Sequence, residues 1–366
     1  KNNSLSYQGT QITISLKNLK ANLSYIKSKV DNTTKIMCVV KAFGYGSEPI
    51  KISKFLEKNG VDYFAVAYVN EGIVLRNSGI KLPILVLHPQ IDDFDEIIEY
   101  NLEPNIYSFR ILNAFIKKSK SHPFHLKFNT GLNRLGFSID DIDELYNVLN
   151  GQVNIKFLLS HLGASEDKKE KNYTENQISL FEKISAEMEN KFGRSFKKHL
   201  LNTSGILNYS KFKYDMVRTG IGLYGYGNNK KFSKLLKPVL SLKSVISQIH
   251  SIKKGESVGY NRGFVAKTNC KIAIIPIGHA DGISRRLGNG KVGFLIKNKI
   301  AKTIGNICMD MLMLDVTNIN CNEGDEVTII DDKIQTAEDL GGKINTISYE
   351  ILTSLSSRIK RTIVNI

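Results

Sequence analysis

The sequence predicts an α/β protein with an N-terminal (β/α)8 TIM barrel and a C-terminal, mainly antiparallel β domain. In the first part of the chain, short apolar runs alternate about eight times with helical patterns, as in a parallel sheet covered by helices. After Lys237-Pro238, turn signals such as Asn289-Gly290 separate the apolar runs instead. The 366 residues suffice for both domains. We assign residues 11–235 to the barrel and residues 236–366, joined by residues 1–10, to the β domain.

The barrel elements are expected in the order that the apolar runs give. Ser15 is expected to cap a first helix, in which apolar residues from Leu16 to Val30 recur every three or four positions. Further helical patterns cover residues 92–100, 139–149 and 174–188. The eight expected strands cover residues 36–40, 63–67, 84–87, around 105–107, 124–128, 155–159, 199–201 and 216–218.

The second domain is expected to consist mainly of strands joined by tight turns. Helical segments after Thr336 and Thr346 are expected to close it. The expected strands cover residues 239–252, 271–277, 292–296, 301–304, 311–316 and 326–330.

Composition argues against several classes of protein. The apolar stretches are too short to span a bilayer, and no secretory signal opens the chain, so a cytoplasmic enzyme is expected. The four cysteines lack metal-binding spacing and the seven histidines form no HExxH motif, so we expect free thiols and no metal site. The net charge of +16 arises from lysines spread over predicted helix surfaces, without a nucleic-acid-binding signature. A polyanion-binding protein remains the alternative from another class.

Polar residues at the ends of the predicted barrel strands indicate the position of an active site. Barrel enzymes carry their chemistry at the carboxyl ends of the strands, where this chain has Lys41, Lys127, His161, Thr203 and Arg218. A lysine that closes a buried strand needs a partner or must be made neutral. Reaction with an aldehyde cofactor makes a lysine neutral, and activated lysines form such adducts.

The glycine-rich run at residues 218–225 contains GxGxxG, the spacing of dinucleotide-binding loops. It follows the last barrel strand, and no acidic residue that could hold a ribose occurs between Gly220 and Glu256. A single-phosphate site is therefore favoured, to which Thr203 and Ser204 would add hydroxyls. A purely structural turn remains the alternative.

Eight motifs, in this order, resemble those of the alanine racemases, which are fold-type III pyridoxal-phosphate enzymes. The first, residues 40–46, resembles the family's KANAYGHG segment, from which Phe43, Gly44 and Ser47 depart. His279 also departs, because the family usually has a tyrosine that narrows the entrance to the site. The remaining motifs cover residues 130–137, 160–162, 217–225, 258–260, 275–282, 305–310 and 349–352.

The resemblance implies a role for each site residue. Lys41 would bind pyridoxal 5′-phosphate covalently and act as one catalytic base, with Tyr260 as the other base on the opposite face of the substrate. Arg218 would meet the pyridine nitrogen, and His161 would lie beside Arg218 and Tyr260. Arg134 and Met309 would bind substrate, and Lys127 matches a lysine that some relatives carry as a carbamate; an ordinary lysine near an anion is the alternative. The phosphate ligands would be Tyr45, Thr203, Ser204, Gly220, Ile221 and Tyr349.

The resemblance also implies an isomerase (EC 5.1.1.1) that makes D-alanine for peptidoglycan, as a homodimer with composite active sites. A serine or broad-specificity racemase is the nearest alternative. A fold-type III decarboxylase would carry a carboxylate where Arg218 stands, and a non-catalytic cofactor carrier would lack the β domain. Because the chain does not begin with Met, we also consider a piece of a longer protein, such as a racemase fused behind a Mur ligase.

Overall fold

The computed structural model describes residues 9–149 and 154–365, which form two compact units. The barrel unit consists of Leu19–Gly44 and Pro49–Leu236. The β unit contains the described residues up to Asn18, then Tyr45–Glu48, and the chain from Lys237 onward. Residues 1–8, which we assigned to the β domain with the rest of 1–10, lie outside the described residues.

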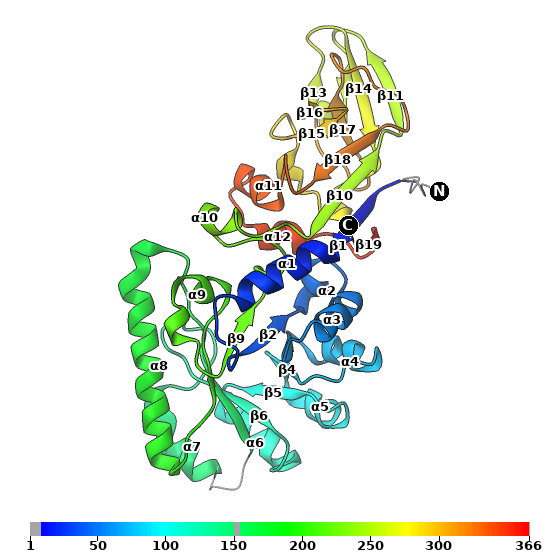
Figure 1. Cartoon of the computed structure of the whole chain (residues 1–366). Coiled ribbons are helices and arrows are strands. Elements are labelled where there is room, and N and C mark those ends of the chain that lie inside the picture. Colours follow the sequence, from blue (N-terminus) through cyan, green and yellow to red (C-terminus); the bar gives the residue numbers. More distant parts are fainter. Residues whose placement is uncertain (1–8, 150–153, 366) are drawn as a thin grey trace. The chain divides into compact units, whose positions relative to one another are not determined.

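Eight parallel strands close into a barrel, which confirms the predicted fold of the first part of the chain (Figure 1). Neighbouring strands follow the chain order, and the first pairs with the last. The strands are β2 (Lys35–Val39), β3 (Tyr63–Val66), β4 (Ile84–Val86), β5 (Glu103–Ile106), β6 (Phe124–Lys127), β7 (Ile155–Leu159), β8 (Lys198–His199) and β9 (Met216–Thr219). The helices are α1 (Leu16–Lys27), α3 (Pro49–Lys58), α4 (Val69–Asn77), α5 (Phe94–Glu99), α6 (Phe109–Lys118), α7 (Ile142–Leu149), α8 (Lys171–Phe192), α9 (Thr203–Asn208) and α10 (Lys230–Ser233).

The barrel strands are buried except at Lys35, Lys156 and Lys198, as both faces of a helix-covered parallel sheet should be. Every residue of β3, β4, β5, β6 and β9 is buried. Ser15 caps α1 as predicted, because its hydroxyl accepts the N–H of Asn18 at 3.2 Å. The helix ends at Lys27 rather than at Val30, since the N–H groups of Lys29 and Val30 turn to carbonyls three residues back.

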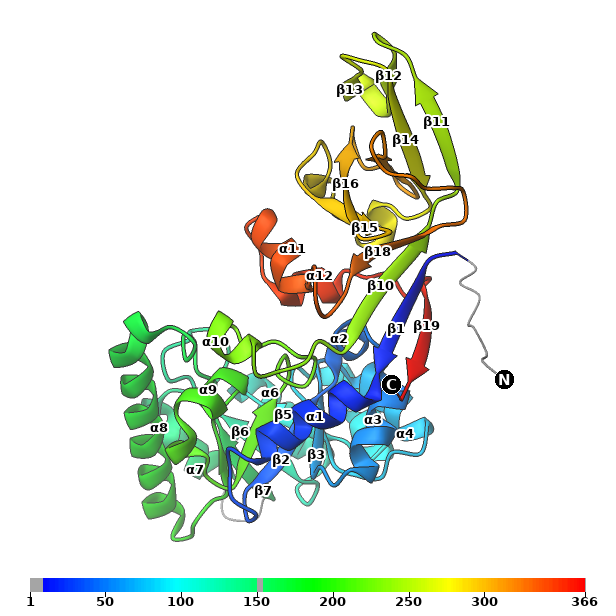
Figure 2. The same cartoon turned by 45° about the horizontal axis from the view of Figure 1, so that its top comes forward.

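The β unit contains one nine-stranded sheet, and all its strand pairs except β1–β19 are antiparallel, as predicted for a mainly antiparallel domain. Residues 11–15, which the sequence placed at the start of the barrel domain, form the strand β1 of this sheet. Figure 2 shows β1 between β10 and β19. In spatial order the strands are β11 (Gln248–Ile252), β14 (Cys270–Ile275), β17 (Leu312–Asp315), β16 (Lys299–Ile304), β15 (Gly293–Ile296), β18 (Glu326–Ile330), β10 (Leu240–Val245), β1 (Gln11–Ser15) and β19 (Lys360–Val364).

The strand expected at residues 239–252 is two strands in the structure. The chain changes partners at Ile246 and Ser247: β10 pairs with β1 and β18, whereas β11 pairs with β14. A small ribbon, β12 (Ser257–Val258) with β13 (Phe264–Val265), follows. The two expected helices are α11 (Ala337–Lys343), capped by the hydroxyl of Thr336, and α12 (Ser348–Thr353).

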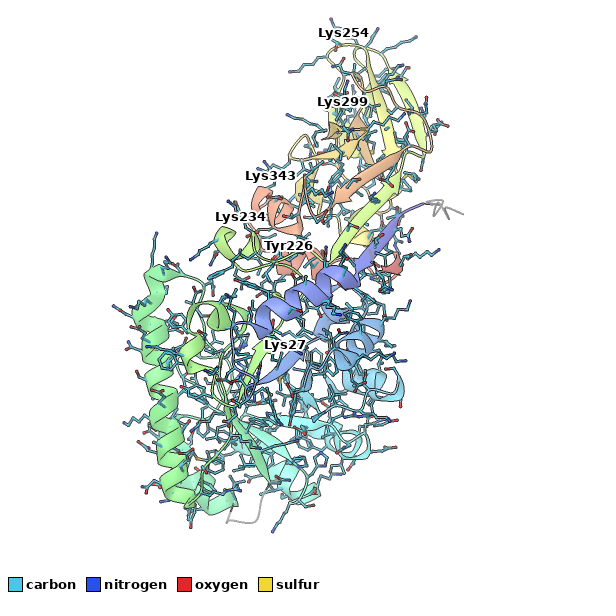
Figure 3. The ribbon with its side chains drawn as sticks, viewed as in Figure 1. Lys27, Tyr226, Lys234, Lys254, Lys299 and Lys343 are labelled. Atoms are coloured by element: carbon cyan, nitrogen blue, oxygen red, sulfur yellow. The ribbon has the colours of Figure 1, made fainter. Side chains whose placement is uncertain are left out.

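Lysines of the β unit lie on its surface. Lys254, Lys299 and Lys343 are exposed, and their side chains point outward in Figure 3. Within the described ranges, no helix is long and apolar enough to cross a membrane.

Candidate active site

The barrel unit gathers positively charged residues from the ends of its strands. Lys127, the last residue of β6, is buried, and no hydrogen bond or ion pair of its amine occurs among the described residues. Burial lowers the pKa of Lys127 to about 7, and three nearby positive charges act in the same direction: Arg218, Arg134 and Lys41. So many cations around one point attract an anionic ligand.

Lys41 follows β2 and opens a short left-handed turn, α2 (Lys41–Tyr45). The φ angles of Ala42, Phe43 and Gly44 are 52°, 55° and 61°, in a region that residues other than glycine rarely adopt. Glu71 stabilises this turn: one carboxylate oxygen accepts the N–H of Ala42 at 2.7 Å, and the other accepts the N–H of Ala67 at 2.7 Å. The turn therefore fixes the backbone of the lysine that would hold the cofactor.

The amine of Lys41 is partly buried, and three effects act on its pKa. Burial lowers it, the positive charge of Arg134 lowers it further, and the negative charge of Glu71 opposes both; the pKa is lower than in a free lysine. A lowered pKa increases the neutral fraction of the amine, which is the form that attacks an aldehyde or removes a proton.

Arg218 is held by acceptors on two sides. Its Nη1 donates to Nδ1 of His199 at 2.6 Å, and its Nη2 donates to the carbonyls of Ser160 at 2.7 Å and Leu200 at 2.9 Å. Among the described residues, no partner of its Nε occurs, so this N–H can face a ligand atom. Burial lowers the pKa of Arg218 to about 10, which still leaves it protonated at neutral pH.

His161 follows β7 and lies beside Arg218, as predicted. Its Nδ1 is 3.2 Å from Nη2 of Arg218. Burial, and then the charge of Arg218, keep the pKa of His161 well below its usual value, so the ring is neutral. Because Nδ1 must accept from a guanidinium, the single ring proton is assigned to Nε2, which is therefore a donor.

Thr203 organises the glycine-rich loop. Its hydroxyl oxygen accepts the N–H groups of Gly220 and Gly222, both at 3.2 Å. A Cβ at Gly222 would lie 2.7 Å from the Thr203 methyl group, so the loop requires glycine there. The neighbouring Ser204 hydroxyl lies 2.9 Å from Nδ2 of Asn228. The N–H of Ile221 has no acceptor within the part of the chain that the structure describes, and it is available to an anion.

Arg134 lies on an exposed loop that closes back on β6. The side chain of Asn129 accepts the N–H groups of Gly131 and Asn133, and the N–H of Phe137 donates to the carbonyl of Lys127. A Cβ at Gly136 would lie 2.6 Å from the backbone of Asn129. The loop is therefore tightly folded although its arginine is exposed.

The β unit carries the other predicted residues. The rings of Tyr45 and Tyr349 lie with their centroids 5.9 Å apart, and burial raises the pKa of Tyr45. A Cβ at Gly46 would lie 1.9 Å from the carbonyl oxygen of Leu352, so only glycine permits this approach between the chain after Tyr45 and α12.

Tyr260 stands on a rigid backbone with an exposed ring. It follows Val258, which packs in an apolar cluster with Ile272 and Met313, and Nδ2 of Asn306 donates to its carbonyl at 3.2 Å. The residue is 73% exposed, and no hydrogen bond of its hydroxyl occurs among the described residues.

His279 and Met309 lie on adjacent segments. The N–H of His279 donates to the carbonyl of Cys308 at 2.9 Å, and that of Ala280 to the carbonyl of Met309 at 3.0 Å. Arg358 bridges the two segments by ion pairs with Asp281 and Asp310, both at 2.6 Å. His279 is exposed.

Sequence reasoning missed Glu71 and a row of buried polar residues behind Arg218. The signal for Glu71 is weak, because an acidic residue in the first turn of a helix is common. His125 and His199, however, interrupt predicted apolar strands, and this could have singled them out.

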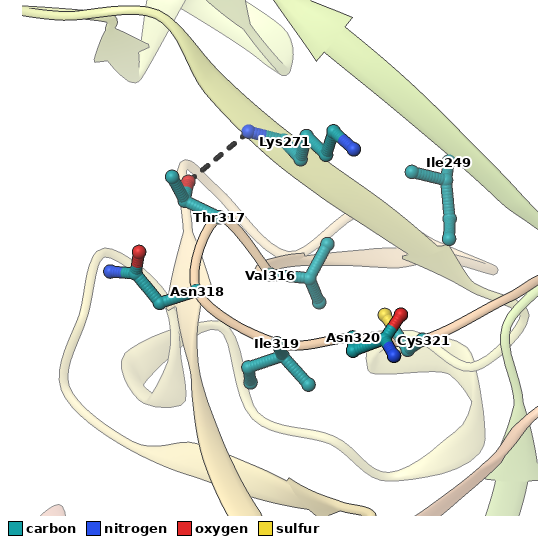
Figure 4. A pocket seen from close by; sticks show the side chains of 8 residues that line it. All are labelled: Ile249, Lys271, Val316, Thr317, Asn318, Ile319, Asn320 and Cys321. Carbon is teal, nitrogen blue, oxygen red and sulfur yellow. Dashed lines mark hydrogen bonds between the residues drawn. The ribbon is translucent and has the colours of Figure 1, made fainter.

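One pocket of about 340 Å³ in the β unit contains none of the predicted residues (Figure 4). It lies beside the backbone of Lys271, whose N–H donates to the hydroxyl of Thr317 at 3.1 Å. Across residues 9–149 and 154–365, no group of three or more acidic, histidine or cysteine side chains could hold a metal ion.

Comparison with known proteins gives one family for the whole chain. A model described as "Alanine racemase, N-terminal domain" matches residues 14–228, and "Alanine racemase, C-terminal domain" matches residues 239–363. The alanine racemase of Clostridium kluyveri is 35% identical over 363 residues, covering 95% of this chain and 92% of the relative. That of Clostridium tetani is 34% identical, covering 95% of this chain and 93% of the relative.

Solved structures agree with these relatives. The alanine racemase from Clostridium difficile 630 superposes with a TM-score of 0.91 at 31% identity, covering 98% of this chain and 96% of that one. The enzyme from Bartonella henselae, described with covalently bound pyridoxal phosphate, gives a TM-score of 0.89 at 28% identity, covering 98% and 100%. The chain therefore belongs to the alanine racemase family of isomerases.

Proposed function

We propose that the enzyme interconverts L-alanine and D-alanine with pyridoxal 5′-phosphate, using Lys41 and Tyr260 as bases on opposite faces of the substrate. The observation that carries this proposal is the setting of Arg218. Its guanidinium is buried, held on two sides, and has one N–H directed to no group among the described residues. An arginine in that setting can donate to a pyridine nitrogen without protonating it.

The residues of the barrel unit fit the cofactor. The N–H of Ile221, which finds no acceptor among the described residues, and the loop that Thr203 holds suit a phosphate group. The resemblance adds Ser204, Gly220, Tyr45 and Tyr349 as ligands of that group. The amine of Lys41 suits an aldehyde because its pKa is lowered. When bound, pyridoxal phosphate supplies an aldehyde carbon for amines and a conjugated ring that makes the Cα–H of an amino acid acidic.

The two bases act on opposite faces because a single base tends to return the proton to the face it came from. Lys41 takes or gives the proton on one face, and the phenol of Tyr260 does so on the other. His161 supports Tyr260: with Nδ1 occupied by Arg218, its Nε2–H is the donor left to stabilise a phenolate. Arg134 would bind the carboxylate of the substrate, and Met309 would contact substrate and cofactor.

A homodimer explains the exposure of the β-unit residues. Tyr260 and Met309 are 73% and 59% exposed, although catalysis requires the tyrosine to meet a substrate away from bulk water. We propose that the β unit of one subunit completes the site on the barrel of the other, so that a two-fold dimer has two equivalent sites.

Lys127 is proposed to be carbamylated. Its pKa of about 7 leaves a large neutral fraction, and a neutral amine adds to carbon dioxide. The nitrogen–carbon bond forms, one C=O electron pair moves to oxygen, and a proton leaves the nitrogen for solvent. The product is an anion among Lys41, Arg134 and Arg218, which converts a repulsive arrangement into an attractive one and would orient Arg134.

We propose that the reaction takes place in the cytoplasm and supplies D-alanine for peptidoglycan. The four cysteines, which are free thiols, suit a reducing compartment. A longer parent protein, with this chain fused behind a Mur ligase, stays a prediction from the sequence.

Borohydride trapping tests the assignment of Lys41. The protein is reduced with borohydride, digested, and searched by mass spectrometry for the cofactor adduct, while a coupled assay measures D-alanine formed from L-alanine. Lys41→Ala should lose both the adduct and the activity. Lys54→Ala, which changes an exposed lysine of α3, is the matched control and should keep both. An adduct that persists in Lys41→Ala would refute the assignment.

A further inference from the structure

A row of buried polar side chains crosses the interior of the barrel behind Arg218. We call Glu103, His125, His199 and Arg218 the Glu103 row. Oε2 of Glu103 is 2.8 Å from Nε2 of His125, whose Nδ1 is 2.9 Å from Nε2 of His199, whose Nδ1 is 2.6 Å from Nη1 of Arg218. All four residues are at most 5% exposed. Glu103 begins β5, so the row extends from the amino ends of the strands toward the proposed site.

The protons along this row can point in one direction only. Arg218 is always a donor, so Nδ1 of His199 must accept and its proton must lie on Nε2. That proton donates to Nδ1 of His125, which leaves the proton of His125 on Nε2, directed at Glu103. Burial is the largest effect on the pKa of both histidines and lowers it, in agreement with neutral rings.

Glu103 is held as a carboxylate at the end of the row. Burial alone would raise its pKa, but hydrogen bonds from His125 and Lys156 outweigh burial and the pKa is lowered. Nζ of Lys156 is 2.5 Å from Oε1, and the Tyr63 hydroxyl is 3.1 Å from Oε2. A buried carboxylate is expensive to desolvate, so its presence here needs a reason beyond packing.

Aromatic rings surround the middle of the row. The ring of His125 stacks on that of Phe157, with centroids 5.0 Å apart and planes at 24°. The rings of His199 and Phe157 meet edge to face at 5.3 Å. These apolar walls exclude other hydrogen-bond partners, so the order of donors and acceptors is set at the ends of the row, by Glu103 and Arg218.

We propose that Glu103 and His125 are positioning residues, which fix the tautomer of His199 and thereby the orientation of the Arg218 guanidinium toward the cofactor. The inference rests on the proposed function for what Arg218 contacts. An unprotonated Nδ1 of His199 accepts a hydrogen bond from Nη1 of Arg218. This bond, together with those from Nη2 to the carbonyls of Ser160 and Leu200, sets the direction in which the Nε–H of Arg218 points. The opposite tautomer would place an N–H of His199 against Nη1, and the guanidinium would have to turn away.

Glu103→Gln tests the direction of the row, because an amide accepts at one end and donates at the other. Lys156 can only donate, so it pairs with the oxygen of the new amide. The amide N–H groups then point at His125, and the rings of both His125 and His199 must change tautomer. Adding Lys156→Met removes the amine that binds the amide oxygen. The amide can then turn, so that its oxygen accepts the N–H of His125 as the carboxylate does. Tyr63→Phe is the matched control, since it removes a hydrogen bond to the same carboxylate without interrupting the row.

Two readouts separate a positioning role from a structural one. Nitrogen-15 NMR of histidine-labelled holoenzyme reports which ring nitrogen carries the proton. The absorption spectrum of the cofactor reports how often L-alanine converts it to its amine form per racemisation, a side reaction that should increase when Arg218 turns away. We expect Glu103→Gln to protonate Nδ1 of His199, to lower kcat about 10- to 100-fold at little-changed KM, and to increase the side reaction.

The double variant should restore the wild-type tautomer and most of kcat, and Tyr63→Phe should change neither readout. Glu103→Gln with an unchanged His199 tautomer and unchanged side reaction would overturn the proposal, and so would a double variant as impaired as the single one. If Glu103→Gln does not fold, the wild-type holoenzyme still tests the proposal, because a proton on Nδ1 of His125 or of His199 in the nitrogen-15 spectrum would overturn it. A wild-type protein that fails to racemise alanine refutes the proposed function instead, because the tautomers are measured independently of activity.

Discussion

The barrel unit and the β unit hold their functional residues in opposite ways. In the barrel unit, Arg218 and Thr203 are 5% and 3% exposed, and each is hydrogen bonded on several sides. In the β unit, the hydrogen bonds of Tyr260 to other described residues involve its backbone, and the residue is 73% exposed. Both backbones are well defined by the surrounding chain, so the difference lies in the side chains.

This difference indicates that one chain organises the barrel residues by itself but leaves the β-unit residues exposed. The barrel unit already has its cations, its neutral histidine and the glycine-rich loop that we propose for phosphate in place, and such preorganised electrostatics need no rearrangement during a reaction. The exposed residues of the β unit gain a defined environment only when something covers them. We attribute this contrast to a second subunit that covers the exposed residues of the β unit.

The largest effect is expected from separating the two bases onto different chains. Lys41→Ala and Tyr260→Phe homodimers should each lose at least about 1,000-fold of activity, since general bases and nucleophilic lysines contribute on that scale. Mixing the two after dissociation should produce heterodimers, about half of all dimers. In each heterodimer one site has both substitutions and the other has neither, so about a quarter of all sites should recover wild-type turnover.

Subunit exchange must be verified for this experiment, for example with differently tagged chains that co-purify. Each homodimer mixed with itself is the control. If exchange is verified and the mixture stays as inactive as its parents, Lys41 and Tyr260 do not meet across a subunit boundary.

Lys127 should make the barrel unit sensitive to pH and carbon dioxide. Its pKa of about 7 lies below that of an unfolded lysine, so the unfolded state binds more protons between about pH 7 and pH 10. Stability should therefore rise with pH across that window in carbonate-free buffer, by about 1.4 kcal/mol for each unit of pKa shift. Bicarbonate should stabilise the folded state further, because a carbamate on Lys127 would be an anion among cations in the folded state alone. Urea unfolding at several pH values measures this.

Lys127→Met isolates the contribution of this amine. In the variant, the free energy of unfolding should no longer rise with pH through this group, and bicarbonate should no longer affect it. Its activity should be about 10-fold lower if a carbamate orients Arg134. Equal slopes for wild type and variant would show that Lys127 is neither depressed in pKa nor carbamylated.

The sequence predicted the barrel because strand periodicity and chain order determine that fold almost completely. It also predicted Lys127 and Arg218, because a charged residue in a buried strand stands out. The strands β1 and β19 were missed although residues 11–15 alternate buried Ile12 and Ile14 with partly exposed neighbours. Their pairing joins residues about 350 positions apart, and no local pattern shows such a contact.

The backbone around Lys41 could not be predicted from residue preferences. Ala42 and Phe43 disfavour positive φ, and only Gly44 suggests it. The turn exists because Glu71, 29 positions after Ala42, accepts an N–H that the turn exposes. Side chains that are distant in the sequence decide such details, and the same holds for the Glu103 row.

Glu71→Gln tests whether this turn matters for Lys41. An amide can accept at only one end, so the N–H of Ala42 or that of Ala67 loses its acceptor. We expect roughly a 10-fold loss of kcat/KM and slower formation of the borohydride-trapped adduct, an effect comparable to losing one hydrogen bond to a charged group. Glu57→Leu is the control for losing backbone acceptors away from the site, because one carboxylate oxygen of Glu57 accepts the N–H groups of both Lys81 and Leu82, and an amide there could keep both. Similar losses in both variants would mean that Glu71 only stabilises the fold.

The smallest effect is expected at His279, where the family usually has a tyrosine. His279 is exposed and its backbone is fixed against Cys308, so its substitution should change the entrance rather than the fold. Imidazole is shorter than phenol, and a wider entrance favours the larger substrate. A size difference of one group in a pocket changes specificity by about 1 kcal/mol, so His279→Tyr should lower the ratio of kcat/KM for L-serine to that for L-alanine roughly five-fold. His250→Tyr, a surface position on β11, controls for the added ring. A ratio that stays within experimental error of wild type in His279→Tyr would remove His279 as a determinant of substrate size, and a serine preference would then have to arise inside the barrel.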